Sequence, residues 1–461
     1  MGIMPIPTRN SAVARRRQLK QAILEVCANA DTPAASLFTG FSEDDWQGVL
    51  RWLDMSGMAL YFIDRVRRSG LGSSLPERIL RLLDLRLERN RERTRAMLED
   101  VRMLAGWFDA ASIEYALLKG ISLTPDSVPA NCLRWQADLD FLVRRKDSRL
   151  ACDYISRLGY RLRLDTGDTV EFIWGSARIK DVAELYCAES PRAFELHIAQ
   201  DDSDVRARDV LARRRTRLLE GIELSTLSPT DILVRQALHL SKHLCGERTR
   251  ISWVLEFKRH VEARRGDAAF WAEVESIANQ EDNAGLAISM ALWLAREFFG
   301  PLYVDHFDHR KADRLPARVR MWLQRYAHDV LISDSIASKH YTLLRAEIPG
   351  QACDSKSLRR LLIPLHLPFR ITMPSPRETL AGRVGRWVTE ARHFFTRLRF
   401  HAIEGLWFAI EASRWRKAVA RCEEAGPSRI IAGAGLCFPM SRPYERPEAT
   451  PDEVFPETVT R

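Results

Sequence analysis

The sequence predicts an α+β fold, in which a small mixed β-sheet is flanked by N-terminal helices and by a larger C-terminal helical region. Two observations support this prediction. Apolar residues recur every three or four positions over the first hundred residues and again beyond residue 228, as on one face of a helix. Between these regions, short β-rich runs alternate apolar and polar residues, as half-buried strands do.

The first region, residues 1–110, is predicted to be helical. Ser42 followed by Asp45 is typical of a capped helix start, and an apolar stripe follows it. From Pro76 onward, one apolar face lies opposite a face rich in Arg and Glu. This pattern predicts a single long helix that ends before Ile113.

The middle region, residues 111–227, is predicted to form the core sheet. A helix from about Ser148 to Leu158 is expected within it, with Asp147 as its cap and Gly159 in the left-handed conformation that ends helices. The expected strands are 114–118, 139–143, 161–164, 170–174, 182–187 and 193–198.

Helices are predicted again after the sheet. Ser228 and Pro229 are typical of a helix start, with proline at the first helical position, and they open a helical domain over residues 228–345. A second helical run is expected in a basic and aromatic region, residues 346–440. The tail, residues 441–461, places prolines among charges and is predicted to be disordered.

Composition indicates an ordinary globular chain of 461 residues, since 46% are apolar and 28% are charged. The formal net charge of +9 favours phosphate-bearing or otherwise anionic partners, although the excess is mild for this length. No uninterrupted apolar run reaches the roughly 18 residues of a membrane span, and no export signal is visible. The 8 cysteines include no C-x-x-C pair, so we expect reduced thiols and a cytoplasmic location.

The most informative segment is the run from Ala137 to Val143, which contains Asp138 and Asp140. On a strand, these two carboxylates project from one face while the apolar residues between and after them enter the core. Adjacent carboxylates repel, and a hard divalent cation such as Mg²⁺ or Mn²⁺ between them relieves the repulsion. The alternative is an edge strand with two solvated aspartates.

A third carboxylate follows on a later predicted strand. Phe194, Leu196 and Ile198 are apolar, whereas Glu195 and His197 share the opposite face. Glu195 is the candidate for completing a two-metal site together with the aspartate pair. Without that pair, Glu195 would be interpreted as a surface residue of an amphipathic strand.

Upstream, Lys119 and Gly120 end a predicted strand, and a helix is expected from about Ser122. Such a junction exposes backbone N–H groups to an anion, and the lysine adds a positive charge. Arg134 could reach a triphosphate with its fork of donors. The alternatives are an ordinary turn and a surface arginine.

Two further patterns have weaker functional interpretations. His239 and His243 are spaced to hold zinc on one helix face, but no glutamate follows His239 as in zinc proteases, so a structural or substrate-facing role is preferred. The basic cluster Arg213 to Arg217 is interpreted as a solvated helix face, with guidance of a polyanionic acceptor as the alternative.

In the last helical run, aromatic residues between Phe394 and Trp415 interleave with arginines. We interpret this pattern as aromatic core packing with a charged outer face, because the stripe keeps helical spacing. Peripheral contact with a membrane surface, or contact with nucleic acid, is the alternative.

Taken together, these motifs resemble the bacterial uncharacterised nucleotidyltransferase family, a branch of the DNA polymerase beta-like nucleotidyltransferase superfamily. The resemblance covers roughly residues 75–300. It rests on Leu118-Lys119-Gly120, Arg134, Asp138 to Val143, Gly159-Tyr160 and Phe194 to His197, and further on Asn90, Pro229, Asp231, His239, His243 and Trp253.

The resemblance implies a nucleotidyltransferase core in which Asp138, Asp140 and Glu195 are catalytic and bind metal, Mg²⁺ or Mn²⁺. It also implies that triphosphate lies at the Lys119–Gly120 turn. The superfamily's usual Gly-Ser pair is absent, because Ile121 separates Gly120 from Ser122.

The hypothesis from the sequence is therefore a metal-dependent enzyme that moves a nucleoside monophosphate from a nucleoside triphosphate, such as ATP, to an unidentified acceptor. That acceptor is a protein, a small molecule or a nucleic acid. One alternative is a catalytically inactive nucleotide- or partner-binding module of the same fold. Another is a D-x-D glycosyltransferase, but residues 113–137 supply few of the alternating strands and helices that such a fold needs.

Overall fold

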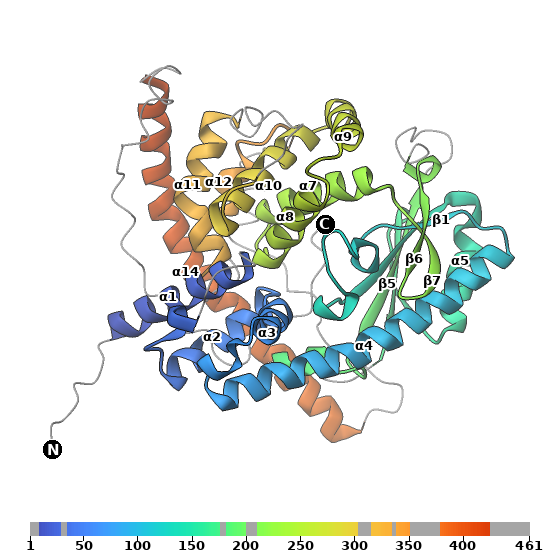
Figure 1. Cartoon of the computed structure of the whole chain (residues 1–461), viewed down its shortest axis with the longest axis horizontal. Helices are drawn as coiled ribbons and strands as arrows, with labels where there is room; N and C mark the ends of the chain where they lie inside the picture. The colour runs from blue at the N-terminus through green and yellow to red at the C-terminus, as the bar shows by residue number, and fades with distance from the viewer. Residues whose placement is uncertain are drawn as a thin grey trace. The chain divides into compact units, whose positions relative to one another are not determined.

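The structure is a computed structural model, and it describes residues 9–28, 35–175, 181–199, 210–302, 315–333, 338–350 and 379–424 (Figure 1). The chain forms two compact units. The first contains Met1–Leu240 and Ile251–Ala312, and the second contains Ser241–Arg250 and Asp313–Arg461. The predicted α+β fold class is confirmed.

Helices form the N-terminal part of the first unit, as predicted. They are α1 (Arg9–Ala28), α2 (Glu43–Met55), α3 (Ala59–Arg68) and α4 (Glu77–Ala110), with short 3-10 helices η1 (Ala35–Phe38) and η2 (Leu71–Ser74). The predicted cap of α2 is confirmed, because Ser42 and Asp45 form a reciprocal capping box. The predicted long helix is α4, which runs unbroken for 34 residues.

The sheet of the first unit has seven strands in the order β3-β4-β5-β2-β1-β7-β6. It is mixed, since β2 is parallel to β5, and β1 is antiparallel to β2 but parallel to β7. The strands are β1 (Tyr115–Leu117), β2 (Asp138–Arg144), β3 (Arg161–Asp165), β4 (Thr169–Trp174), β5 (Arg192–Ala199), β6 (Arg215–Leu219) and β7 (Ile222–Thr226).

One predicted strand is wrong. Residues 182–187 were expected to be extended, but Val182–Tyr186 forms the 3-10 helix η6. Asp181 caps it by accepting a hydrogen bond from the Ala183 amide. Because this local cap satisfies the backbone without a neighbouring strand, the strand-like composition does not decide the structure.

The hairpin of β6 and β7 was not predicted. Glu220 and Gly221 both have positive φ, at 50° and 79°, which is the backbone of a tight two-residue hairpin turn. The prediction that the basic cluster forms a solvated helix face is therefore wrong, because Arg213 and Arg214 lie in the turn before β6, and Arg215 and Arg217 lie on β6.

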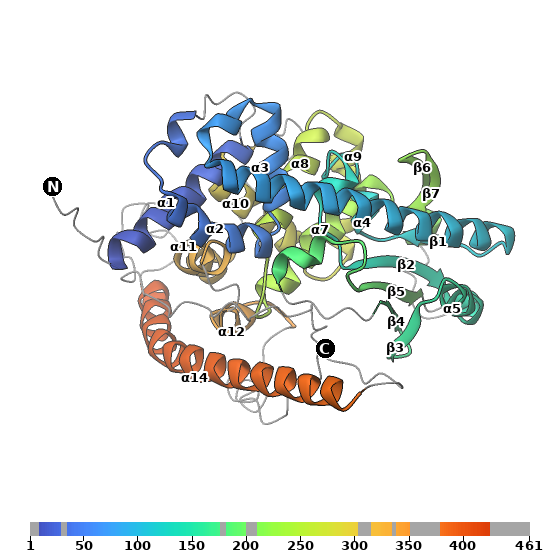
Figure 2. The same cartoon turned by 90° about the horizontal axis from the view of Figure 1, so that it is seen from below.

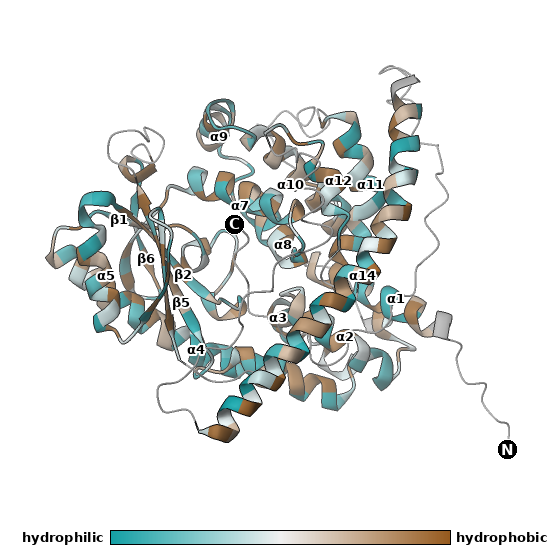
Figure 3. Ribbon diagram, turned by 180° about the vertical axis from the view of Figure 1, so that it is seen from behind, coloured by the Kyte–Doolittle hydropathy of each residue, from teal (hydrophilic) through white to brown (hydrophobic). Residues whose placement is uncertain are grey.

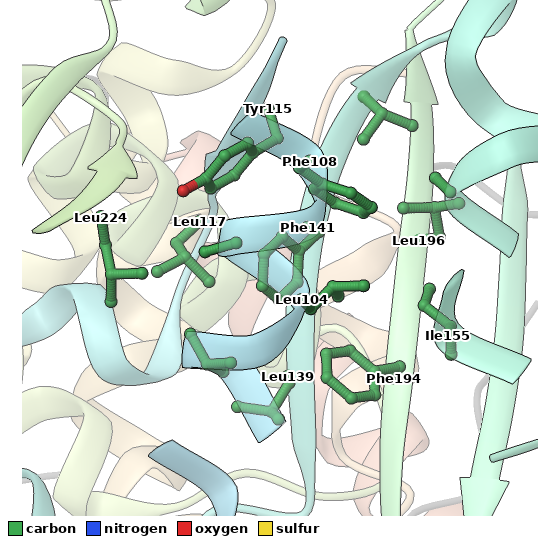
Figure 4. Close-up of a cluster of buried hydrophobic side chains, with 14 of the residues drawn as sticks. Leu104, Phe108, Tyr115, Leu117, Leu139, Phe141, Ile155, Phe194, Leu196 and Leu224 are labelled. Atoms are coloured by element: carbon green, nitrogen blue, oxygen red, sulfur yellow. The ribbon is translucent and has the colours of Figure 1, made fainter. Parts of the chain in front are cut away.

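A hydrophobic core lies between the sheet and two helices, α4 and α5 (Ser148–Arg157) (Figure 2). Figure 4 shows Phe108 of α4 and Ile155 of α5 packed against Phe141 and Phe194 of the central strands. Gly159 has φ of +89° just after α5, as predicted for a helix C-terminus.

The remaining helices follow the sheet, as the sequence predicted. They are α7 (Pro229–Leu244), α8 (Ile251–Ala263), α9 (Ala268–Gln280), α10 (Ala284–Phe299), α11 (Ala317–Leu331), α12 (Tyr341–Arg345) and α14 (Leu380–Glu424). No helix among the described residues is long and apolar enough to cross a membrane. The tail predicted to be disordered, residues 441–461, lies outside the described residues.

Candidate active site

Two parallel neighbouring strands bring three of the predicted site residues together. In the register of β2 and β5, Asp138 pairs with Ala193, Asp140 with Glu195, and Leu142 with His197. Side chains alternate between faces, so Asp138, Asp140, Glu195 and His197 project from the same face of the sheet. This face lies opposite the hydrophobic core.

The alternation in sequence explains this placement. Leu139, Phe141 and Val143 of β2, and Phe194 and Leu196 of β5, are each at most 2% exposed and form the centre of the core. Because the side-chain period of a strand is two residues, burying these five residues forces the acidic residues between them to the opposite face.

Lys119 lies over the aspartate pair. Its Nζ is 3.4 Å from Asp138 Oδ2 and 3.1 Å from Asp140 Oδ1. Burial disfavours the charged ammonium, but the charges of Asp138, Asp140 and Glu195 outweigh burial and raise the pKa of Lys119. The lysine is therefore positively charged at neutral pH and offsets part of the negative charge of the site.

His197 is the residue of this cluster that sequence reasoning left out of the site. Its Nε2 lies 3.3 Å from Asp140 Oδ1 and 3.6 Å from Glu195 Oε2. Burial alone would lower the pKa of His197, but hydrogen bonds to Asp140 and Glu195 raise it to about 9. The sequence could have indicated that His197 belongs to the site, because His197 lies two residues after Glu195 on the same strand face.

Glu195 is ionised at neutral pH. Burial raises its pKa, but the hydrogen bond with His197 opposes this effect, and the net pKa of Glu195 is lowered. A carboxylate in this state can bind a cation or accept a proton.

A fourth carboxylate lies on the next strand of the sheet, β4, in register with Glu195. Glu171 of β4 pairs with Glu195 of β5 in the antiparallel register. Its Oε1 lies 2.8 Å from Arg163 Nη1 of β3, so an arginine balances its charge. Burial, and then the neighbouring carboxylates, raise the pKa of Glu171. Sequence reasoning missed Glu171, which a strand pattern alone does not distinguish from a solvated residue.

The turn after Lys119 depends on glycine. Gly120 has φ of +71°, and a Cβ on it would collide with the side-chain oxygen of Gln136. The helix expected from about Ser122 is instead the 3-10 helix η3 (Gly120–Leu123). Ser122 is fully buried there, and its hydroxyl has no hydrogen-bond partner among the described residues.

Arg217 of β6 fixes the same turn from the far side. It donates hydrogen bonds to the backbone oxygens of Ser122, at 3.0 Å, and Thr124, at 2.6 Å. Arg213 pairs with Asp231 at 2.6 Å, and Arg214 with Glu114 at 3.1 Å. These arginines of the basic cluster thus have partners within the first unit.

Arg134 pairs with a carboxylate other than those of Asp138 and Asp140. Its Nε lies 3.2 Å from both carboxylate oxygens of Glu256 on α8, and Tyr61 donates a hydrogen bond to the same carboxylate at 2.9 Å. Burial opposes its charge, but Glu256, then Tyr61 and Asp138, raise the pKa of Arg134. The Asp138 charge therefore acts on Arg134 without a direct contact.

Arg93 of α4 supports the two strands that carry the carboxylates. This residue is 1% exposed and donates hydrogen bonds to the backbone oxygens of Gln136, Cys187, Ser190 and Pro191. Gln136 lies just before β2, and Pro191 lies just before β5. One buried side chain therefore fixes the starts of both strands.

The residues of the cluster fit a divalent cation. Possible ligand atoms of Asp140, Glu195 and His197 lie within 4.8 Å of one another, a group that contains two of the three predicted metal ligands and has His197 in place of Asp138. Asp140 is 1% exposed, and its Oδ2 is buried without a hydrogen-bond partner among the described residues. Leaving a buried carboxylate oxygen unpaired is costly, and a cation would satisfy it. Carboxylate oxygens are the ligands that Mg²⁺ and Mn²⁺ prefer.

The two histidines of α7 have other surroundings. The ring of His239 packs edge-on against Trp253, with 4.6 Å between ring centroids. His243 Nδ1 lies 3.2 Å from the backbone oxygen of Arg248. Neither belongs to a metal-competent group found among the described residues.

The mixed sheet presents carboxylates from two neighbouring strands, as the resemblance of the sequence motifs to nucleotidyltransferases implies. Residues 42–300 match the family described as "Uncharacterised nucleotidyltransferase". Because the match covers more than half of the chain, this protein belongs to that family. The match includes Lys119, the β2 aspartates and Glu195.

Among solved structures, the chain is similar to the crystal structure of an antigenic nucleotidyltransferase-like protein from Paracoccidioides brasiliensis. The sequence identity is 15%, the match covers 42% of this chain and 91% of that chain, and the TM-score is 0.27. At this TM-score the likeness adds nothing to the assignment. No curated protein matches the chain significantly.

Proposed function

We propose that this protein is a metal-dependent nucleotidyltransferase that moves a nucleoside monophosphate from a nucleoside triphosphate, such as ATP, to an acceptor hydroxyl or phosphate. The observation that supports this proposal most strongly is the in-register pairing of Asp140 with Glu195, beside Asp138, on the face of the sheet opposite the core. The family match is the second support.

In this proposal, Asp138, Asp140 and Glu195 hold Mg²⁺ or Mn²⁺. When bound, the divalent ions would lower the pKa of the acceptor hydroxyl and neutralise the charge that develops on the leaving diphosphate. The rigid strands contribute positioning, because the register of β2 and β5 fixes the spacing of the carboxylates before any substrate arrives.

Lys119 would bind the triphosphate. Its ammonium lies beside the two aspartates on a side chain that is 33% exposed, so solvent and ligand can reach it. A flexible four-carbon stem lets the charge turn from the carboxylates to phosphate oxygens held next to them. Gly120 would let the backbone approach the same phosphates, with Ser122 and Arg134 supporting the site from inside the fold.

Glu195 would also accept the proton of the acceptor. Its lowered pKa keeps it ionised at neutral pH, as this role requires. His197 Nε2 lies 3.3 Å from Asp140 and 3.6 Å from Glu195, and His197 would hold their carboxylates in orientation as a positioning residue.

The chain's partners in this proposal are a nucleoside triphosphate and an acceptor that is a protein, a small molecule or a nucleic acid. The cysteines that the structure describes are free thiols. Free thiols agree with the reducing environment of a cytoplasm, which we propose as the location.

The test is label transfer by the purified full-length protein. Each α-labelled nucleoside triphosphate is incubated with Mg²⁺ or Mn²⁺, with and without cell extract, and transfer of label to any acceptor is measured. We expect metal-dependent transfer by the wild type and none by Asp138→Ala/Asp140→Ala.

The matched control is Asp168→Ala, which removes an aspartate whose side chain is 76% exposed and lies outside the carboxylate cluster. This variant should transfer label at the wild-type rate. Tight nucleotide binding with no transfer in any mixture would favour the alternative, a catalytically inactive binding module of the same fold.

A further inference from the structure

Helix α14 of the second unit exposes an apolar stripe. Trp387 is 66% exposed, Phe395 is 64% exposed and Leu398 is 53% exposed. Among the described residues, nine of the thirteen large hydrophobic side chains that are exposed belong to this one helix. They are Leu380, Val384, Trp387, Val388, Phe394, Phe395, Leu398, Leu406 and Ile410.

These side chains share one face of the helix. At 3.6 residues per turn, they fall within an arc of about 160° of its circumference. Figure 3 shows hydrophobic residues interspersed with hydrophilic ones along α14. The first and last of the nine are 30 positions apart, so the stripe extends for roughly 45 Å.

The other face of α14 packs within the second unit. Phe408 and Trp415 are buried, and the ring of Trp415 lies 5.9 Å from that of Tyr326 on α11. Glu411 pairs with Arg325 of α11 at 3.0 Å. The expected aromatic packing therefore describes this face alone, and the exposed stripe is a second apolar surface.

Charge is distributed unevenly around α14. Seven basic side chains are exposed, namely Arg383, Arg392, Arg399, Arg414, Arg416, Lys417 and Arg421. The acidic side chains described on this helix are buried or half-buried, namely Glu390, Glu404 and Glu411. The described exposed surface of the helix is therefore apolar and basic, with no exposed carboxylate.

We propose that the exposed face of α14 docks on an anionic lipid bilayer surface, with its apolar stripe in the interface and its arginines against lipid phosphates. Long amphipathic helices with aromatic and aliphatic residues beside exposed basic residues bind membranes in this way. Two other occupants fit less well. Nucleic acid would stack on aromatic rings, but most of the stripe is aliphatic. A second copy would bring like charges together.

The experiment is sedimentation of the full-length protein with vesicles. Vesicles of phosphatidylcholine alone are compared with vesicles in which about one lipid in three is phosphatidylglycerol, at low and high salt. We expect binding to the anionic vesicles only, weakened by salt. Equal sedimentation with both kinds of vesicle, or with neither, would overturn the proposal.

The variant Trp387→Ser/Phe395→Ser/Leu398→Ser removes three exposed anchors. We expect the partitioning of this variant onto anionic vesicles to fall at least about tenfold, since each of the three side chains contributes apolar area to the interface. The matched control is Leu162→Ser/Leu218→Ser, which removes exposed leucines of β3 and β6 that are 60% and 71% exposed. This control should bind as the wild type does, and an equal loss in the control would overturn the proposal.

A second measurement does not depend on whether the triple variant folds. Brominated lipid placed in the anionic vesicles should quench tryptophan fluorescence of the wild type, and Trp387→Phe should reduce that quenching. An absence of quenching would overturn the proposal. So would a wild type that does not bind vesicles but forms an oligonucleotide complex that the triple variant loses. A wild type that does not bind vesicles but forms a dimer that the triple variant loses would overturn it as well.

Discussion

Asp140 and Glu195 stand opposite each other on neighbouring parallel strands, and His197 Nε2 lies 3.3 Å from the first carboxylate and 3.6 Å from the second. Fifty-five residues separate the two acids along the chain. The imidazole bridges them, so one side chain helps to orient both carboxylates, and Lys119 also contacts Asp140.

His197→Ala should therefore weaken the metal site without removing a carboxylate. Loss of a side chain that orients ligands costs about 10- to 100-fold in metal affinity. The Mg²⁺ concentration that gives half of the maximal rise in Tm should increase by that factor. His197→Gln keeps a donor at this position and should lie between the wild type and His197→Ala, and identical values for all three would contradict the role.

Arg93→Met should destabilise the fold. The methionine fills a similar volume but leaves the carbonyls of Gln136, Cys187, Ser190 and Pro191 without their buried donor. The free energy of unfolding should fall by about 3 kcal/mol. Arg95→Met, two residues along the same helix and exposed, should change it by less than about 0.5 kcal/mol. Denaturant titration measures both, and equal effects would refute the assigned role of Arg93.

Replacing Gly120 and Gly106 with alanine should change the free energy of unfolding in opposite directions. Gly120 has φ of +71° and no room for a Cβ, so Gly120→Ala should lower the free energy of unfolding by about 1–3 kcal/mol. Gly106 lies in the interior of α4 with nothing within 4 Å of a Cβ, so Gly106→Ala should raise it by about 0.5–1 kcal/mol. Thermal or denaturant unfolding gives both signs, and a stabilised Gly120→Ala would contradict the constraint at the turn.

His260 of α8 should make the fold sensitive to acid. It is 0% exposed, and its Nε2 lies 4.0 Å from Asp126 Oδ2, with Arg264 and Arg217 as the other nearby charges. Burial lowers the pKa of His260 to about 4, despite the opposing charge of Asp126. The folded chain therefore keeps this imidazole neutral at a pH where the unfolded chain protonates it.

The pH dependence of the free energy of unfolding follows from that difference between the folded and unfolded chains. The stabilising effect of His260 is fully present above pH 6.5 and is lost as the pH falls toward 4, by about 1.4 kcal/mol per pH unit. Between pH 7 and pH 5 the wild type should lose about 2 kcal/mol more than His260→Phe. Denaturant unfolding at the two pH values measures the difference, and parallel losses would show that His260 does not titrate as expected.

The sequence predicted the two strands that carry the candidate site because period-two alternation is a local pattern. Residues 138–143 and 194–198 place acids on one face and apolar residues on the other, and the structure confirms both strands. The pairing of those strands is not local. It depends on burying Phe141 and Phe194 together beneath α4, which brings Asp140 to Glu195.

Other features depend on partners far along the chain. Arg134 pairs with Glu256, 122 residues later, and no motif near either residue predicts the contact. The charges of β6 hid its alternation, although Glu220 and Gly221 were a usable turn signal. At η6, a side-chain cap from Asp181 prevailed over strand-like composition. At Arg134 and at η6, therefore, a tertiary or capping contact outweighs local propensity, whereas the β6 hairpin was a local signal that was missed.

The most direct test of the central claim is a titration of the purified protein with Mn²⁺, followed by electron paramagnetic resonance of the free ion. The carboxylate cluster predicts saturable binding by the wild type and by the surface control Asp168→Asn. It predicts binding weakened by about 100-fold or more in Asp140→Asn and in Glu195→Gln, since each removes a charged ligand. Unchanged Mn²⁺ affinity in both folded variants would contradict the claim that these acids form a metal site.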